Sequence, residues 1–129
     1  MKSPTIVLMS ILVILLASAC ASTQPITEPV AVIEAFHEAL NDGDMDAAMN
    51  FVADDTRFIL DTLYSGKAQV RNFYEGTMAI NTQWELGDLK AEGIAVTWIG
   101  QSTHDDGGFA PGPFEAVVQN GKIVSFKAL

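Results

Sequence analysis

Cysteine and basic residues are scarce in this chain, which has one cysteine, seven lysines and arginines, and sixteen aspartates and glutamates. A single cysteine cannot form an internal disulfide, so the core alone must stabilise the folded part. The net charge of −9 repels phosphate backbones, and we therefore exclude nucleic acid as a partner. The sequence also lacks G-x-S-x-G, C-x-x-C, H-E-x-x-H and Walker-type motifs, and it indicates no cofactor.

The first residues have the order of a secretory signal. Lys2 precedes an apolar run over residues 6–16 that only Ser10 interrupts, and small residues follow it. The run is too short to span a bilayer comfortably as a mature helix. We therefore expect an exported protein with a signal peptide over residues 1–19.

Two processing sites compete at the end of this signal. The residues ASA fit an A-x-A cleavage site, which would release a soluble secreted protein, whereas LASAC resembles a bacterial lipobox that ends at Cys20. We favour lipidation of Cys20, because it gives the unpaired thiol of an exported protein a role. Each buried acyl methylene contributes about 0.8 kcal/mol to membrane binding, so the lipid would anchor the protein at a membrane of the cell envelope.

The remaining chain is expected to form a tether and one domain. Residues 20–28 are mostly polar and contain Pro25, which is typical of a linker. Residues 29–129 suffice for one domain with one modest core.

Three helices are expected in the first half of this domain. From Pro29 to the NDG turn, apolar side chains recur every three or four positions, as in an amphipathic helix. A second helix begins after Asp44 as N-cap and continues to about Ala53, and SGKAQVRNFYEG at 65–76 forms a third. Between them, TRFILD at 56–61 is a strand candidate.

The second half has the pattern of strands. WELGDLKAE at 84–92 and IAVTWIGQST at 94–103 are two of them, and the second alternates in polarity. FEAVVQNGKIVSFKAL at 114–129 predicts a hairpin, because Asn120-Gly121 supplies the positive φ angles of a type I′ turn. GGFAPGPF at 107–114 is interpreted as a mobile loop. Helices followed by strands predict an α+β fold with an antiparallel sheet.

The stretch NDGDMDAA places Asp42, Asp44 and Asp46 at alternate positions, as at the start of a calcium loop. Such a loop needs glycine at its sixth position and glutamate at its twelfth. Those positions hold Ala47 and Ala53. We therefore expect no metal here, and interpret the stretch as a turn between two helices.

Three segments together resemble the nuclear transport factor 2-like superfamily and, within it, the SnoaL-like domains and the ketosteroid isomerase relatives. They are AFHEALNDGDMDAAMNFVADD, YSGKAQVRNFYEG and NGKIVSFKAL, and the similarity covers nearly all of residues 29–129. The resemblance implies a cone of three N-terminal helices packed on a curved mixed or antiparallel sheet, with an apolar cavity between them. The residues it places around a ligand are Phe36, Phe58, Tyr64, Phe73, Trp84, Trp98 and Phe114.

The catalytic positions of the ketosteroid isomerase relatives are not matched. The resemblance puts their tyrosine at Phe36, their aspartate base at Leu60, and their late aspartate at Pro113 or Phe114. Asp61 lies one residue from the base position, and such a step along a strand points a side chain to the other face. An isomerisation of the ketosteroid type is therefore not expected.

SnoaL-like cyclases use more variable polar residues, and the candidate bases here are Asp61 and His104, with Tyr64 and Trp98 beside them. Each has a structural alternative, since Asp61 suits a turn and His104 lies in the flexible-looking sequence STHDDGG. His37 lies near the apolar stripe of the first helix, and we interpret it as a residue at the edge of the core.

Two functions follow from these observations. The first is a non-catalytic domain that binds a small apolar ligand, or a partner, in or on the cone. The second is a cyclase or isomerase with Asp61 or His104 as base, which would need at least two polar side chains converging in the cavity. We favour the first. The resemblance also implies a homodimer of this chain through the open sheet face, because relatives of this fold often dimerise there.

Overall fold

The computed structural model describes residues 24–129, so the predicted signal peptide and Cys20 lie outside the described residues. Within residues 24–129, no helix is long and apolar enough to cross a membrane. The elements, in chain order, are α1 (Pro29–Asn41), α2 (Met45–Met49), β1 (Val52–Ile59), β2 (Leu63–Ser65), α3 (Lys67–Ala79), β3 (Gln83–Glu92), β4 (Ala95–His104), β5 (Gly107–Gln119) and β6 (Lys122–Ala128).

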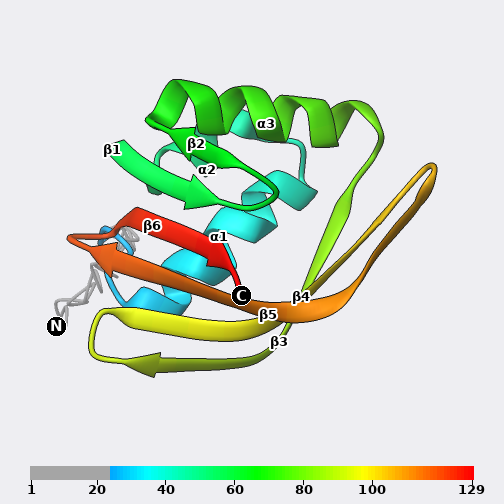
Figure 1. Ribbon diagram of the computed structural model, residues 1–129. Coiled ribbons are helices and arrows are strands. Elements are labelled where there is room, and N and C mark those ends of the chain that lie inside the picture. The colour runs from blue at the N-terminus through cyan, green and yellow to red at the C-terminus, as the bar shows by residue number, and fades with distance from the viewer. Residues whose placement is uncertain (1–23) are drawn as a thin grey trace, which may run out of the picture.

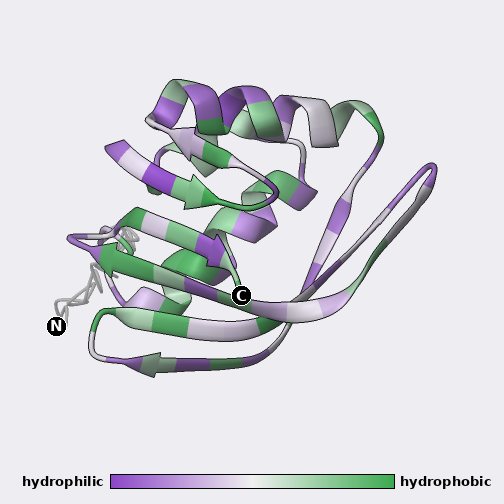
Figure 2. Cartoon of the chain, viewed as in Figure 1, coloured by the Kyte–Doolittle hydropathy of each residue, from purple (hydrophilic) through white to green (hydrophobic). Residues whose placement is uncertain are grey.

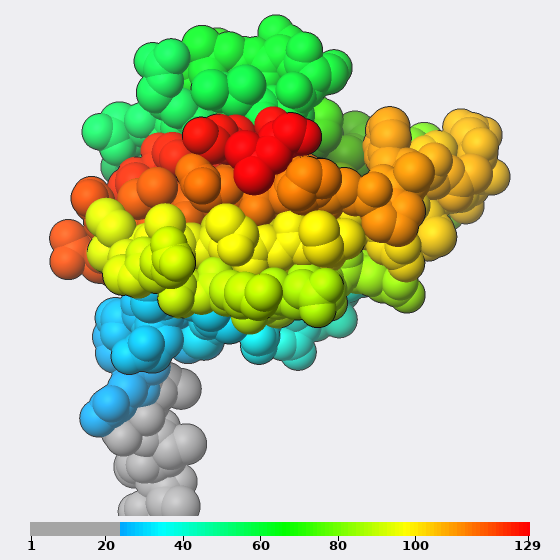
Figure 3. Space-filling view, turned by 60° about the horizontal axis from the view of Figure 1, so that its bottom comes forward, coloured from blue at the N-terminus to red at the C-terminus, as the bar shows by residue number. Residues whose placement is uncertain are grey.

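The six strands form one mixed sheet in the order β2-β1-β6-β5-β4-β3. Neighbours pair antiparallel except β1 and β6, which run parallel. This pair makes the sheet mixed, which is one of the two forms that the resemblance implies, and it departs from the antiparallel sheet expected from the order of helices and strands. It arises because the last strand returns beside the first. Figure 3 shows β3, β4, β5 and β6 lying side by side across one face of the molecule.

The helices cover the other face of the sheet, and the whole domain has the shape of a cone. Figure 1 shows α1 behind β5 and β6, while α3 lies beside β1 and β2. Two strands separate α2 from α3, so the helices are not all N-terminal, as the resemblance had implied. Hydrophobic and hydrophilic residues alternate along much of the strands (Figure 2). The fully buried side chains of the core include Val32, Ile33, Phe36, Val52, Phe58, Val70, Tyr74, Val96 and Ile123.

The turn between α1 and α2 confirms the interpretation of the three aspartates. Gly43 has a φ of +73°, and the side chain of Asp44 accepts a hydrogen bond from the main-chain N–H of Ala47 at 3.0 Å. Asp46 lies in the first turn of α2 and accepts a hydrogen bond from Arg71 at 2.8 Å. Across the part of the chain that the structure describes, no three His, Cys, Asp or Glu side chains gather as metal ligands would.

Three element boundaries differ from the sequence prediction. The second helix ends at Met49 rather than near Ala53, because Val52 already pairs with Ile123 of β6. The strand expected at 56–61 therefore begins earlier and spans Val52–Ile59. The third helix continues past Gly76 to Ala79. In the first case, pairing with a strand distant in sequence outweighs the local helical pattern.

The segment interpreted as a mobile loop, residues 107–114, is the first half of β5. It pairs with β4, with Phe109 opposite Ser102 and Pro113 opposite Ile99. A register shift between Gly100 and Ser102 accommodates the segment. The resulting β4–β5 hairpin extends beyond the rest of the sheet (Figure 1).

The hairpin between β5 and β6 is confirmed, with φ angles of +51° at Asn120 and +75° at Gly121. The end of the predicted tether packs against this turn, since a Cβ at Gly121 would lie 2.8 Å from the main-chain oxygen of Ile26. The chain therefore enters the domain at the β5–β6 turn.

Candidate functional site: an apolar pocket inside the cone

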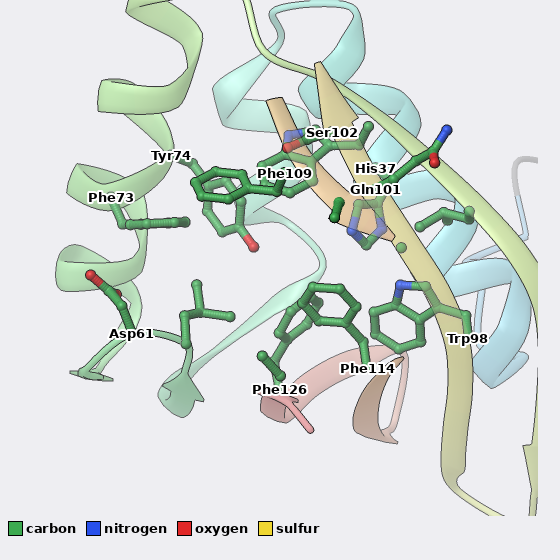
Figure 4. A pocket seen from close by; sticks show the side chains of 16 residues that line it. His37, Asp61, Phe73, Tyr74, Trp98, Gln101, Ser102, Phe109, Phe114 and Phe126 are labelled. Carbon is green, nitrogen blue, oxygen red and sulfur yellow. The ribbon is translucent and has the colours of Figure 1, made fainter. Parts of the chain in front are cut away.

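A pocket of about 360 Å³ lies between the helices and the inner face of the sheet (Figure 4). Its walls come from α1, α3, the strands β3 to β6 and the turn between β1 and β2. Of the described residues that line it, Asp61 alone carries a charge at neutral pH. The lining residues are His37, Leu60, Asp61, Phe73, Tyr74, Trp84, Leu86, Trp98, Gly100, Gln101, Ser102, Phe109, Ala110, Phe114, Phe126 and Ala128.

Aromatic rings form much of the wall. The rings of Trp98 and Phe114 stack with centroids 5.7 Å apart and an interplanar angle of 11°. They lie on adjacent strands and pair directly across β4 and β5. Phe126 packs edge-on against Trp98, at a centroid distance of 5.2 Å. Of the residues that the resemblance placed around a ligand, Phe73, Trp84, Trp98 and Phe114 line the pocket.

Phe36 and Phe58 do not line the pocket, contrary to the expectation. Both are fully buried in the core. Phe58 stacks on Phe126 at a centroid distance of 4.5 Å, and Phe126 stands between it and the pocket. Phe36 is edge-on to His37 and Tyr74, which themselves face the pocket. These two phenylalanines therefore support the wall from behind.

His37 is a pocket residue, and its interpretation as a residue at the edge of the core was wrong. The side chain is 4% exposed, and Nδ1 lies 2.8 Å from the main-chain oxygen of Ile33, one turn earlier in α1. Burial lowers the pKa of His37 to about 4, and the hydrogen bond to Ile33 acts in the opposite direction without offsetting it. The imidazole is therefore neutral near pH 7, with its Nδ1 proton donated to Ile33.

Two hydroxyl groups accompany His37. Tyr74 of α3 is 1% exposed, and its hydroxyl oxygen points toward the open centre of the pocket (Figure 4). Burial raises the pKa of the Tyr74 phenol, so it stays protonated. The Ser102 hydroxyl of β4 is buried and has no hydrogen-bond partner among the residues described. The pocket thus combines hydrocarbon walls with a few neutral polar atoms.

The predicted base Asp61 lies at the mouth of this pocket, in the turn between β1 and β2. Its side chain is exposed, and its Oδ1 accepts a hydrogen bond from the Tyr64 hydroxyl at 3.0 Å. Tyr64 itself does not line the main pocket. It lies beside a separate, shallow depression with Phe73, on the outer side of α3 and β2.

The other predicted base, His104, does not line the pocket. It ends β4 at the far end of the β4–β5 hairpin, where its Nδ1 accepts a hydrogen bond from the main-chain N–H of Asp106 at 3.2 Å. Its ring lies edge-on to Phe109. Asp61 and His104 therefore do not converge in one cavity, which is what catalysis by this pair would require.

Sequence reasoning missed His37, Tyr74 and Ser102 as pocket residues. A usable signal existed for His37, since it lies four residues after Ile33 and three before Leu40 on the buried face of α1. A histidine on that face must be satisfied locally or face a cavity. For Ser102 the signal was weaker, because its inward position depends on β4 continuing in phase past Gly100.

Comparisons with known proteins place the chain in a family. The sequence profile of the SnoaL-like domain matches residues 33–126, whereas no curated protein matches the sequence. A nuclear transport factor 2-like protein of unknown function from Cytophaga hutchinsonii superposes with a TM-score of 0.71 at 18% identity, over 84% of this chain and 92% of that one.

Two further solved structures are similar in fold. A proposed ketosteroid isomerase from Kribbella flavida has a TM-score of 0.69 at 20% identity, covering 79% of this chain and 77% of that one. The protein TerC, co-crystallised with polyporic acid, has a TM-score of 0.65 at 14% identity, covering 78% and 89%. Identities this low establish a shared fold, and fold alone does not determine function. With the profile match over residues 33–126, the chain belongs to the SnoaL-like domain family, and it shares the fold of the nuclear transport factor 2-like protein.

Proposed function

We propose that the domain binds a small, neutral and largely apolar molecule in its pocket and does not transform it. The observation that supports this proposal is the lining, in which aromatic and aliphatic side chains surround a volume of about 360 Å³ and, among residues 24–129, Asp61 at the mouth is the one charged group. Ligand pockets have volumes of roughly 300–1,000 Å³ and mostly apolar walls with a few polar groups. The pocket matches that description at its small end, which favours a molecule of two or three rings.

The polar atoms of the pocket favour binding over catalysis. A general base works best when its pKa lies near the operating pH, and the pKa of His37 is about 4. Asp61 is exposed and already hydrogen-bonded to Tyr64. The alternative of a cyclase or isomerase rests on Asp61 alone at the mouth, since His104 lies elsewhere.

Relatives of the fold are consistent with either role. TerC was co-crystallised with an organic small molecule, polyporic acid, while the Kribbella flavida protein is named as a proposed isomerase. For the present chain, the ionisable side chains inside the pocket are His37 and Tyr74, and burial lowers the pKa of the first to about 4 and raises that of the second. Neither is a general base matched to neutral pH, which supports the first role. Small-molecule binding accounts for the composition of the lining and does not require any of its residues to act as a strong base.

Isothermal titration calorimetry with 2-methoxynaphthalene, a neutral probe with two fused rings, tests this proposal. The variant Ala128→Trp introduces a large ring at a lining position near the end of β6. Its matched control is Leu129→Trp, at the neighbouring exposed position, which does not line the pocket. We expect saturable binding to the wild type and to the control, and a loss of at least about tenfold in affinity for Ala128→Trp. Equal affinities in all three proteins would contradict the proposal.

We further propose that the domain works outside the cytoplasm on a lipid anchor at Cys20. The support is the signal-like sequence from Lys2 to LASAC. The described chain enters the domain at the β5–β6 turn, near Gly121, whereas the β5 residues that line the pocket, Phe109, Ala110 and Phe114, lie in the other half of that strand. An anchor on the Gly121 side would keep that half of β5 farther from the membrane.

Mass spectrometry of the protein extracted from membranes tests the anchor. We expect a mature chain that begins at Cys20 and carries two or three acyl chains. The control is Cys20→Ser, which removes the thiol and should yield an unmodified chain. An unmodified wild-type chain that begins at Cys20, after cleavage behind Ala19, would refute lipidation and favour a secreted soluble protein.

A further inference from the structure

We propose that Nε2 of His37 is the hydrogen-bond acceptor that selects ligands carrying a neutral hydroxyl group, such as a ring alcohol or a phenol. This inference rests on the proposed binding function and narrows it to one chemical class. The proposed binding function gives the imidazole of His37 no role, and this inference makes it a determinant of ligand specificity.

The hydrogen bond to Ile33 fixes which nitrogen is free. Because a main-chain oxygen can only accept, the contact of 2.8 Å from His37 requires the proton on Nδ1. Nε2 of the neutral ring is then an unprotonated acceptor. Nδ1 is turned toward the main chain of α1 while the residue lines the pocket, so the rest of the ring is directed inward. Figure 4 shows the imidazole facing the open part of the pocket.

The neighbours of His37 leave this acceptor without a partner from the protein. The ring is packed against Trp84, Trp98 and Phe126, at centroid distances of 6.2, 5.8 and 6.0 Å. No hydrogen bond joins Nε2 to another residue in the described part of the chain. Among the described residues, Nε2 is not one of the fully buried atoms that lack a partner, so it is open to the pocket. A ligand that brings its own donor can therefore reach it there.

The remaining groups of the pocket favour a hydroxyl over an amine or an acid. Facing His37 from the other elements are the protonated Tyr74 of α3 and aromatic side chains of β3, β4 and β6, and Asp61 is confined to the mouth. A charged group beside His37 would therefore be buried without a counterion. A hydroxyl is neutral, donates to Nε2, and can also accept from a hydroxyl such as that of Tyr74.

A matched pair of probes tests the inference by calorimetry. 2-Naphthol and 2-methoxynaphthalene share the fused rings and the oxygen, but only the first has an O–H to donate. We expect the wild type to bind 2-naphthol about fivefold to tenfold more tightly. This preference should disappear in His37→Phe, which keeps an aromatic ring of similar size without the nitrogen. The control His104→Phe, at the other histidine, should retain it.

Nitrogen NMR on the wild type decides the question even where a variant folds poorly. The chain has two histidines, so the imidazole ¹⁵N signals are simple to assign. We expect 2-naphthol to shift the His37 Nε2 resonance without protonating the ring, while 2-methoxynaphthalene leaves it nearly unchanged and the His104 signals act as reference.

The outcomes separate this inference from the proposed function. Equal affinities for the two probes, with the His37 Nε2 resonance unmoved by either, would overturn the role of His37 and leave binding in the pocket intact. Failure of both probes to bind the wild type would overturn the inference together with the proposed function.

Discussion

The side-chain amide of Asn41, at the end of α1, pairs with both main-chain groups of Trp84 in β3. Its Oδ1 accepts from the Trp84 N–H at 2.7 Å, and its Nδ2 donates to the Trp84 oxygen at 2.8 Å. Because β3 is an edge strand, these groups would otherwise lack a partner from the sheet. One asparagine thus ties the first helix to the strand that carries an indole of the pocket wall.

Replacing Asn41 with alanine should lower the free energy of unfolding by about 1–3 kcal/mol, because two partly buried hydrogen bonds are lost. The matched control Asn72→Ala, at an exposed position of α3, should change it by less than about 0.5 kcal/mol. Urea unfolding followed by tryptophan fluorescence measures both. If the two variants were equally stable, the hydrogen bonds between Asn41 and Trp84 would make no measurable contribution to the free energy of unfolding.

Asp44→Ala should cost about 1 kcal/mol of stability, because the main-chain N–H of Ala47 loses its capping partner. Asp42→Ala is the control, since Asp42 is equally exposed and lies on the other side of Gly43. Thermal unfolding of the two variants, each with and without calcium, provides the comparison. A strong rise of the wild-type melting temperature with calcium would contradict the capping interpretation.

Gly100→Ala should destabilise the domain by about 1–3 kcal/mol and weaken probe binding, because the pocket wall is overpacked. A Cβ at Gly100 would lie 2.9 Å from two ring carbons of Phe114 and 3.1 Å from Nε1 of Trp98. Its register partner, Gly112 of β5, has no neighbour within 4 Å of the same position. Gly112→Ala is therefore the matched control, and calorimetric melting should rank it well above Gly100→Ala. A lower melting temperature for Gly112→Ala than for Gly100→Ala would mean that the Phe114 ring can move to accommodate the added methyl group.

The domain should become less stable as the pH is lowered, and part of this loss should come from His37. The pKa of His37 is about 4 in the folded protein against 6.5 for the free side chain, so the unfolded chain binds the proton first. The loss begins as the pH falls below 6.5, grows to about pH 4, and amounts to something on the order of 3 kcal/mol. Above pH 6.5 this group contributes no pH dependence.

The comparison of wild type with His37→Phe isolates this effect, because the carboxylates titrate alike in both proteins. Urea midpoints between pH 7 and pH 4 should decline more steeply for the wild type than for His37→Phe. His104→Phe should follow the wild type. Parallel curves for all three proteins would show that His37 is not a buried neutral residue.

Local signals in the sequence predicted the elements whose ends are set by nearby residues. The limits of α1, the start of α2 at Asp44 and the turn at Asn120-Gly121 follow from apolar spacing, a capping side chain and a positive φ angle. These features depend on interactions between residues a few positions apart. The three-residue strand β2 has no such signal, because it is mostly exposed and is defined by pairing with β1.

Pairing between distant segments explains the larger errors. The first half of β5 contains glycines and prolines that locally favour a loop, and it becomes a strand only because β4 lies opposite it. Likewise, the parallel pairing of β1 with β6 shortens α2 and begins β1 at Val52. A sequence pattern reports on local preference, and it does not specify which segment will supply a partner.

The sequence predicted the aromatic lining of the pocket, but it did not predict which polar side chains lie inside it. The aromatic residues Phe73, Trp84, Trp98 and Phe114 line the pocket, as the resemblance implied. The predicted base His104 lies outside it, and His37 and Tyr74 provide the inner polar atoms instead. Which polar side chain reaches a cavity depends on the curvature of the sheet and the depth of each helix, and neither is encoded in a short motif.

The indole N–H signals of the two tryptophans test the central claim most directly. Trp84 and Trp98 are the only tryptophans in the chain, and both line the pocket. Titration with 2-methoxynaphthalene, followed in ¹H–¹⁵N correlation spectra, should shift both indole resonances with one saturable curve. Indole resonances that stay in place, while amides on the outer face of the sheet move or nothing moves, would contradict a ligand site inside the cone.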